Sequence, residues 1–95
     1  MRLIFDWDDE KEAKNLKKHG IPFEDAAAVF DDPLAKIFPD PYRHEQRYRI
    51  IGCFENTCLM VVHTSEEVDD DVILVRIISA RKLDKSERKR YENDL

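Results

Sequence analysis

The chain has 95 residues, of which 42% are hydrophobic and 39% are charged, and its formal net charge is −5 at pH 7. This composition predicts a single folded domain over residues 1–95, and it excludes a disordered chain and a general polybasic coat for nucleic acid. The opening residues lack the apolar segment of a signal peptide. No apolar run approaches the roughly 18 residues of a membrane span, so we expect a cytoplasmic protein without membrane contacts.

The predicted elements follow the order β-α-α-β-β-β-β-α, beginning with a strand at 3–6 and a helix at 9–19. Asp8 is suited to cap this helix, because its carboxylate accepts hydrogen bonds from first-turn N–H groups. The helix carries acidic residues first and basic residues last, as the helix dipole favours. Gly20, which follows His19, provides the left-handed stop.

A second helix is predicted from an apolar stripe with the spacing i, i+3, i+4 and i+7. The stripe consists of Phe23, Ala26, Ala27 and Phe30. Residues 31–33 end this helix, and the pattern is then strand-like, with strands at 34–38, 46–54, 57–65 and 72–80. Residues 84–87 form a capping box that opens a last helix to about Asn93.

The strands are joined by short turns, which indicates a mostly antiparallel sheet. The strand at 72–80 has large apolar residues on both faces, so we expect it to be central. The two N-terminal helices have to bury their apolar stripes against one face of this sheet. The predicted class is therefore α+β.

Cys53 and Cys58 flank the tip of the hairpin predicted between 46–54 and 57–65. If Glu55 and Asn56 form a two-residue turn, the two cysteines face each other and are close enough to oxidise. Because cytosolic proteins keep their thiols reduced, we expect two reduced, half-buried thiols. No spacing of Cys and His resembles a zinc site, and we expect no metal and no cofactor.

Charge is distributed unevenly along the chain. Residues 81–91 contain six basic and two acidic side chains, whereas residues 66–71 contain five acidic side chains and no basic one. The global charge therefore does not exclude a local phosphate-binding site. The basic side chains of the first segment are Arg81, Lys82, Lys85, Arg88, Lys89 and Arg90.

Arg76 lies within the apolar strand 72–80, and Arg81 lies just after it. Strand alternation sends Arg76 and Arg81 to opposite faces unless a bulge intervenes. An arginine in such a strand is costly to bury without a partner. Two interpretations of Arg76 remain open: a salt bridge to a helix carboxylate, or a phosphate clamp that uses its guanidinium fork.

A second cationic cluster lies at the end of the first helix, where Lys14 and Lys18 are i, i+4 neighbours and His19 is the last residue. A helix-terminal histidine either interacts with the dipole or transfers protons. We expect His63, in a strand interior, to be structural, and His44, in a loop, to be solvated.

Trp7, at the first strand–helix junction, is either a lid on the core or a platform for base stacking.

Three motifs of the chain resemble the BrnT family of type II toxin–antitoxin toxins, whose fold is similar to that of the RelE-type ribonucleases. The first motif joins FDWD at 5–8 to NLKKHG at 15–20 and FEDAAAVF at 23–30. The second is QRYRIIG at 46–52, and the third combines RIISAR at 76–81 with ERKRYE at 87–92. Together they extend over about residues 3–92.

The resemblance implies a small toxin that degrades RNA and stops translation, with a cognate, BrnA-like antitoxin encoded beside it. It implies that the antitoxin covers the active surface and represses their shared promoter, so this chain meets DNA only in the antitoxin complex. RelE-type ribonucleases are similar in using no metal. The 2′-hydroxyl of the RNA attacks the adjacent phosphorus and leaves a 2′,3′-cyclic phosphate.

For that reaction we expect Arg76 and Arg81 to contact the scissile phosphate. His19 is the first choice for proton transfer, and Tyr91, which resembles the C-terminal tyrosine of RelE-like sites by position, is the second. The expected RNA phosphate-binding residues are Lys14, Lys18, Lys85 and Arg88, and Trp7 is the expected stacking residue.

The chain departs from the family pattern in two places. Pro22 stands where a capping serine is expected before the second helix, although proline is compatible with a helix start. Residues 66–71 form an expected acidic loop that is longer and more negative than in the family pattern. If this loop overhangs the cleft, it weakens RNA binding.

A non-enzymatic interpretation also stays open. The basic C-terminal helix is suited to dock an acidic or amphipathic partner, which would make the chain a protein-interaction module or a toxin that has lost its activity. Alternatively, the acidic residues 66–71 and the basic residues 81–90 pair with each other or between subunits.

Overall fold

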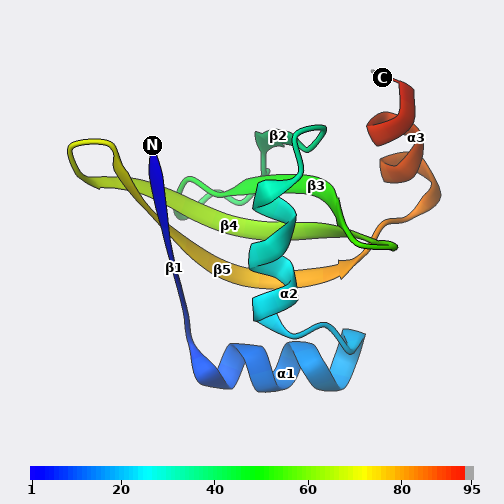
Figure 1. Cartoon of the computed structure of the whole chain (residues 1–95). Coiled ribbons are helices and arrows are strands. Elements are labelled where there is room, and N and C mark those ends of the chain that lie inside the picture. Colours follow the sequence, from blue (N-terminus) through cyan, green and yellow to red (C-terminus); the bar gives the residue numbers. More distant parts are fainter. Residues whose placement is uncertain (94–95) are drawn as a thin grey trace.

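The computed structural model describes residues 1–93. Its elements, drawn in Figure 1, are β1 (Arg2–Trp7), α1 (Asp9–His19), α2 (Phe23–Ala28), the 3-10 turn η1 (Val29–Asp31), β2 (Lys36–Pro39), β3 (Tyr48–Phe54), β4 (Thr57–Asp69), β5 (Val72–Lys82) and α3 (Lys85–Asn93). The α+β class and the order β-α-α-β-β-β-β-α are therefore confirmed. No helix in this part of the chain is long and apolar enough to cross a membrane.

The five strands form one sheet in the order β1-β5-β4-β3-β2. The pairs β5–β4, β4–β3 and β3–β2 are antiparallel. β1 and β5 are parallel, with Arg2 opposite Val72. The sheet is mostly antiparallel, as expected, but the middle strand is β4 rather than β5. β5 is an interior strand between β1 and β4, which accounts for its apolar sequence.

Both predicted ends of α1 are confirmed. The Asp8 carboxylate accepts hydrogen bonds from the N–H groups of Glu10 and Lys11 at 2.9 and 3.1 Å. Gly20 has a φ of 72° and donates its N–H to the carbonyl of Leu16 at 2.8 Å. The helix thus begins and ends on local interactions that its own sequence supplies.

The start of α2 depends on a neighbouring helix. Pro22 precedes α2 and supplies no side-chain cap. Instead, the Glu12 carboxylate of α1 accepts the N–H of Phe23 at 2.9 Å. This contact links the two helices and satisfies one of the first-turn N–H groups that have no partner within α2.

Two apolar clusters lie on opposite faces of the sheet, because neighbouring strand residues point to opposite sides. The first is covered by α2 and η1, and its buried members include Phe23, Ala26, Val29, Ile50, Val61, Val75 and Ile77. The second lies beside α3 and contains Ile51, Met60, Val62 and Leu83, with Tyr91 packed against them. We call these two sides of the sheet the α2 face and the α3 face.

α1 lies along the edge of the sheet (Figure 1), which corrects the expectation that both N-terminal helices cover one face. β1 ends at Trp7 while β5 continues to Lys82, so the last part of β5 has no strand beside it on that edge. Buried Asn15 of α1 takes this place. Its amide donates to the carbonyl of Ala80 at 2.9 Å and accepts the N–H of Ala80 at 3.1 Å. One side chain thus replaces a strand neighbour and holds α1 against β5.

Cys53 and Cys58 form a disulfide, so the expectation of two reduced thiols is wrong for this structure. The hairpin turn is the predicted pair, with Glu55 at a φ of 55°. Cys53 pairs directly with Cys58 across the strands, and their Cα atoms are 3.9 Å apart. The predicted geometry is confirmed, and this close approach outweighs the argument from cellular compartment.

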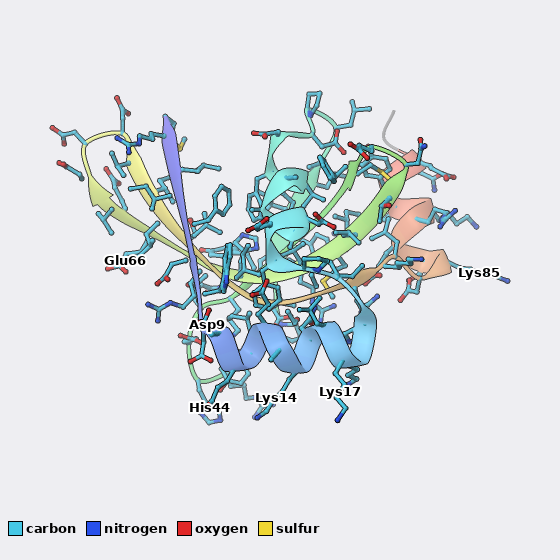
Figure 2. The ribbon with its side chains drawn as sticks, turned by 60° about the horizontal axis from the view of Figure 1, so that its bottom comes forward. Asp9, Lys14, Lys17, His44, Glu66 and Lys85 are labelled. Atoms are coloured by element: carbon cyan, nitrogen blue, oxygen red, sulfur yellow. A yellow bond between two sulfur atoms is a disulfide. The ribbon has the colours of Figure 1, made fainter. Side chains whose placement is uncertain are left out.

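The acidic residues 66–71 do not form a long loop. β4 continues through Asp69, and only Asp70 and Asp71 make the turn to β5. Figure 2 shows Glu66 on the opposite side of the molecule from Lys85 of α3. Within residues 1–93 no ion pair joins this acidic segment to the basic residues that follow β5, because the two lie at opposite ends of that strand. Pairing of the two segments within the chain is therefore excluded.

Candidate functional site

β5 contains a β-bulge. Val62 of β4 pairs with Ser79, but the next residue, His63, pairs with Ile77. Ile78 is therefore an extra residue without a partner on β4. Such a residue shifts the alternation of side chains by one position for the rest of the strand.

The bulge places Arg76 and Arg81 on the same face of the sheet. Arg76 pairs with Thr64 and Arg81 pairs with Met60, two β4 residues that point to the α3 face. Regular alternation would separate the two arginines. Both side chains instead border one groove that runs between α1 and β5.

This groove consists of two adjoining hollows. The first, of about 290 Å³, is lined by Asp6, Trp7, Asp8, Lys11, Arg76, Ile77 and Ile78. The second, of about 410 Å³, is lined by Lys11, Lys14, Asn15, Lys18, His19, Ile78, Ser79 and Arg81. Two residues border both hollows, so they form one continuous depression, which we call the α1–β5 groove.

Lysines give the groove its positive charge. Lys11, Lys14 and Lys18 repeat at i, i+3 and i+7 along one side of α1. Their ammonium groups form no ion pair and no hydrogen bond within residues 1–93, and Figure 2 shows Lys14 extending freely from α1. Because the groove lining contains three lysines and two arginines against two aspartates, its charge favours an anionic ligand such as phosphate.

The two groove arginines already have carboxylate partners. Arg76 donates to Asp6 of β1 at 3.1 Å, in a pair whose side chains are 59% and 50% exposed. Its partner is thus a strand residue rather than a helix residue. Arg81 forms two hydrogen bonds of 2.7 Å to Glu87, which raise the pKa of Arg81. The bidentate, half-buried second pair is the stronger of the two.

Glu87 also belongs to the predicted capping box of α3. Its N–H donates to the Asp84 carboxylate at 2.8 Å, and its own carboxylate accepts the N–H of Asp84 at 3.0 Å. The hydrogen bond from the Glu87 N–H lowers the pKa of Asp84. One carboxylate therefore both begins α3 and holds Arg81.

His19 and Trp7 border the two ends of the groove. His19 is half-buried at the end of α1, lines the second hollow, and its ring forms no hydrogen bond within the described chain. Trp7 lines the first hollow and packs edge-on against Phe23 with ring centroids 6.0 Å apart. Trp7 is thus both a lid on the core and a groove residue.

Tyr91 lies outside the groove, on the β3 side of the sheet. Its hydroxyl donates to Asp32 at 2.7 Å, and Asp32 also accepts the N–H groups of Cys53 and Leu34 at 2.7 and 2.9 Å. Burial raises the pKa of Asp32, but these hydrogen bonds outweigh it, so the pKa is lowered. The hydrogen bond to Asp32 raises the pKa of Tyr91. Tyr91 therefore fastens α3 to the segment before β2, whereas His19 is at the outer edge of β5.

The remaining predicted phosphate-binding residues lie on α3. Arg88 borders a separate hollow of about 160 Å³ beside Cys58 and Lys82. Lys85 extends from α3 into open surroundings (Figure 2). Of the predicted site residues, the groove gathers Trp7, Lys14, Lys18, His19, Arg76 and Arg81, and it leaves out Lys85, Arg88 and Tyr91.

Sequence reasoning missed two important groove residues. Lys11 was recognisable, because it lies on the same helical row as Lys14 and Lys18. Asn15 gave no signal, since an asparagine within a polar helix is expected to be exposed. Residues 1–93 contain no cluster of three or more His, Cys, Asp or Glu side chains arranged to hold a metal ion.

A protein-family model described as the ribonuclease toxin BrnT of type II toxin–antitoxin systems matches residues 7–87. The chain belongs to the BrnT family. No curated protein matches it. The matched region includes every groove residue except Asp6. Because a type II system pairs its toxin with a protein antitoxin, membership of the BrnT family implies an antitoxin partner for this chain.

Proposed function

We propose that this BrnT toxin is a metal-independent endoribonuclease that cleaves RNA in the α1–β5 groove. Cleavage of RNA stops translation, and a BrnA-like antitoxin encoded beside the toxin neutralises it. The observation that supports this proposal most is a row of three lysines along the groove, which form no ion pair within residues 1–93, in a member of a ribonuclease toxin family.

In this proposal the lysines hold the RNA backbone. Lys14 and Lys18 bind phosphates that flank the cleaved bond, and Lys11 extends the same row. A lysine is a compact point charge on a flexible stem, so it suits phosphates whose positions vary. Such contacts are independent of base sequence and weaken as salt increases.

The arginines act on the scissile phosphate itself. A guanidinium fork matches a phosphate as well as it matches a carboxylate, so each arginine exchanges its partner for the substrate. The exposed Arg76–Asp6 pair is weak and exchanges readily. Arg81 exchanges Glu87 for the substrate when extra negative charge develops on the non-bridging phosphate oxygens, which favours the transition state over the ground state. A charged donor that acts in the transition state contributes about 3–4 kcal/mol to lowering the barrier.

The chemical step is an attack of the 2′-oxygen on the adjacent phosphorus. The bond between phosphorus and the 5′-oxygen breaks, which leaves a 2′,3′-cyclic phosphate and a 5′-hydroxyl. We assign the removal of the 2′-hydroxyl proton to His19, which lines the groove beside the lysines, and the 5′-oxygen takes its proton from water. We assign no proton transfer to Tyr91, because Asp32 holds its hydroxyl outside the groove.

The test is cleavage of a defined RNA by the purified chain in excess chelator, with the fragment ends mapped. The variant is Arg81→Ala. The matched control is Arg90→Ala, which removes an α3 arginine whose guanidinium lies over the Phe38 ring at 4.0 Å. We expect fragments with 2′,3′-cyclic phosphate ends from the wild type and the control, and cleavage by Arg81→Ala that is slower by roughly 100- to 1,000-fold.

Arg81→Ala also leaves the Glu87 carboxylate without its cation, so a thermal melt accompanies each rate. Arg81→Lys keeps the charge without the fork, and its rate should lie between those of the wild type and the alanine variant. If Arg81→Ala cleaves RNA at the wild-type rate, the assignment of Arg81 to the scissile phosphate is wrong. No cleavage by folded wild type, even with added ribosomes, would favour the non-catalytic docking module.

A further inference from the structure

We infer that the antitoxin anchors in an apolar hollow on the α2 face, through an amphipathic segment whose aliphatic side chains are flanked by lysine or arginine. This inference rests on the part of the proposed function that gives the toxin a neutralising partner. It adds the place where that partner docks.

The hollow has a volume of about 370 Å³ and lies on the α2 face, opposite the face on which Arg76 and Arg81 lie. Leu3 of β1 and Ile37 of β2 form two of its walls, and Phe30 of η1 forms a third. Ile73 and His63 contribute to its floor. This volume is within the range of roughly 300–1,000 Å³ in which pockets bury most of a ligand's surface.

Aliphatic surface is exposed around the hollow. Met1 is 86% exposed, Ile37 is 59% exposed and Leu3 is 36% exposed, and all three line the hollow. Because they border the same hollow, they form a patch rather than isolated surface residues. A contiguous apolar patch with a polar rim is typical of a protein-binding surface.

The rim of the hollow is acidic. Glu67 points to the same face as Ser65 and pairs with Ile73, two residues that line the hollow. Asp32 is a second acidic residue and belongs to the lining itself. The carboxylate of Glu67 forms no ion pair and no hydrogen bond in the described chain, and none of the residues that line the hollow is Lys or Arg. The hollow therefore complements a cationic amphipathic segment and repels RNA.

β1 connects the hollow with the α1–β5 groove. Leu3 lines the hollow, and Asp6 and Trp7 line the groove. β1 is also an edge strand of the sheet. At about 3.3 Å per residue, Leu3 and Trp7 are separated by roughly 13 Å along the strand. A partner anchored in the hollow thus reaches the groove within a few residues along β1, which explains how docking on one face blocks the other.

The experiment measures binding of the toxin to the protein encoded by the adjacent reading frame, co-expressed with it and purified as a complex. The variants are Ile37→Glu, which places a charge in the apolar wall, and Glu67→Lys, which reverses the rim. We expect dissociation constants weaker by roughly 30-fold or more for Ile37→Glu and about 10-fold for Glu67→Lys.

Each variant has a matched control. Glu66→Lys makes the same charge change one residue earlier, on the opposite face of β4. Leu16→Glu places a carboxylate on a leucine of α1 that is 40% exposed. Both controls should bind the partner as the wild type does. Thermal melts of the free variants establish whether each is folded. If Ile37→Glu does not fold, the affinity of Glu67→Lys alone decides where the partner docks.

Wild-type affinity of Ile37→Glu and Glu67→Lys would overturn the inference, and so would equal losses in Glu66→Lys and Glu67→Lys. Absence of binding to the wild type would do the same. Complex formation that depends on Lys14 and Lys18 alone would place the partner in the groove instead. Free Ile37→Glu should cleave RNA at the wild-type rate. If the wild type does not cleave RNA, the proposed chemistry fails, but the binding comparison still decides the docking site.

Discussion

The α1–β5 groove and the hollow on the α2 face share strand β1, yet they differ in charge, polarity and origin. The groove carries a row of lysines that form no ion pair within residues 1–93. The hollow is largely apolar, with Asp32 in its lining and Glu67 at its rim. The net charge of −5 therefore describes neither surface. The two surfaces therefore favour ligands of opposite charge.

The largest effect should come from Asn15→Leu, which breaks the groove and leaves the hollow intact. The change leaves the buried N–H and carbonyl of Ala80 without partners, at roughly 1–3 kcal/mol each. We expect the free energy of unfolding to fall by roughly 2–5 kcal/mol. Urea denaturation measures this, with Leu16→Ala on the same helix as the control. Equal losses in both variants would show that the amide bonds do not hold α1.

The next effect concerns the groove alone. The double variant Lys14→Glu/Lys18→Glu should weaken RNA binding on the order of 100-fold at low salt and reduce the slope of log affinity against log salt by about 1.4 for single-stranded RNA. Lys17→Glu/Lys85→Glu makes the same charge change outside the groove. Titration of labelled RNA at several salt concentrations compares the two. If both variants lose affinity alike, only the overall charge matters and the groove is not the binding site.

The disulfide lies in neither the groove nor the hollow, so its removal should lower stability without changing the function of either region. Cys53→Ser/Cys58→Ser opens a covalent loop with a sequence separation of 5. Loop entropy predicts a loss of about 2 kcal/mol in the free energy of unfolding. Urea denaturation of the wild type with and without reductant should show the same loss of stability on reduction as the double variant shows. RNA cleavage and antitoxin binding should not change, and a change in either would link the hairpin tip to that region.

The smallest effect should be a pH dependence of stability that arises at the hollow. Burial lowers the pKa of His63, which packs against Phe30 and lies near Asp32 in the lining. The contribution of His63 to stability is therefore full above its ordinary pKa of about 6.5 and is lost as the pH falls below that value. Thermal melts between pH 7.5 and 5 should show a smaller decrease for His63→Gln than for the wild type. Parallel curves would assign the pH dependence to other groups.

Local features of the fold were predictable from the sequence. The caps of α1 at Asp8 and Gly20 and the capping box at Asp84 and Glu87 depend on residues only a few positions apart, so their signals lie within one window of sequence. The facing of Cys53 and Cys58 followed from the turn between them in the same way.

Features that depend on distant residues were not predictable. The parallel pairing of β1 with β5 joins residues 70 positions apart, and it gives Arg76 its partner Asp6. The bulge at Ile78 depends on how β5 pairs with β4. Ile77 and Ile78 are neighbouring, identical residues, so the sequence does not indicate which of them lacks a partner on β4. The groove residues were therefore found as separate lysine and arginine clusters, while their meeting at one edge required the structure.

The distance between β1 and its partner also has a consequence for synthesis. β1 and α1 leave the ribosome well before the strand that both of them need, because Arg2 pairs with Val72 and Asn15 binds Ala80. A chain that ends before β5 has no second wall for the groove and no edge for α1 to occupy. A copy of this toxin that lacks β5 is therefore expected to be unfolded and inactive, and the order of translation itself delays the assembly of the site until β5 has been made.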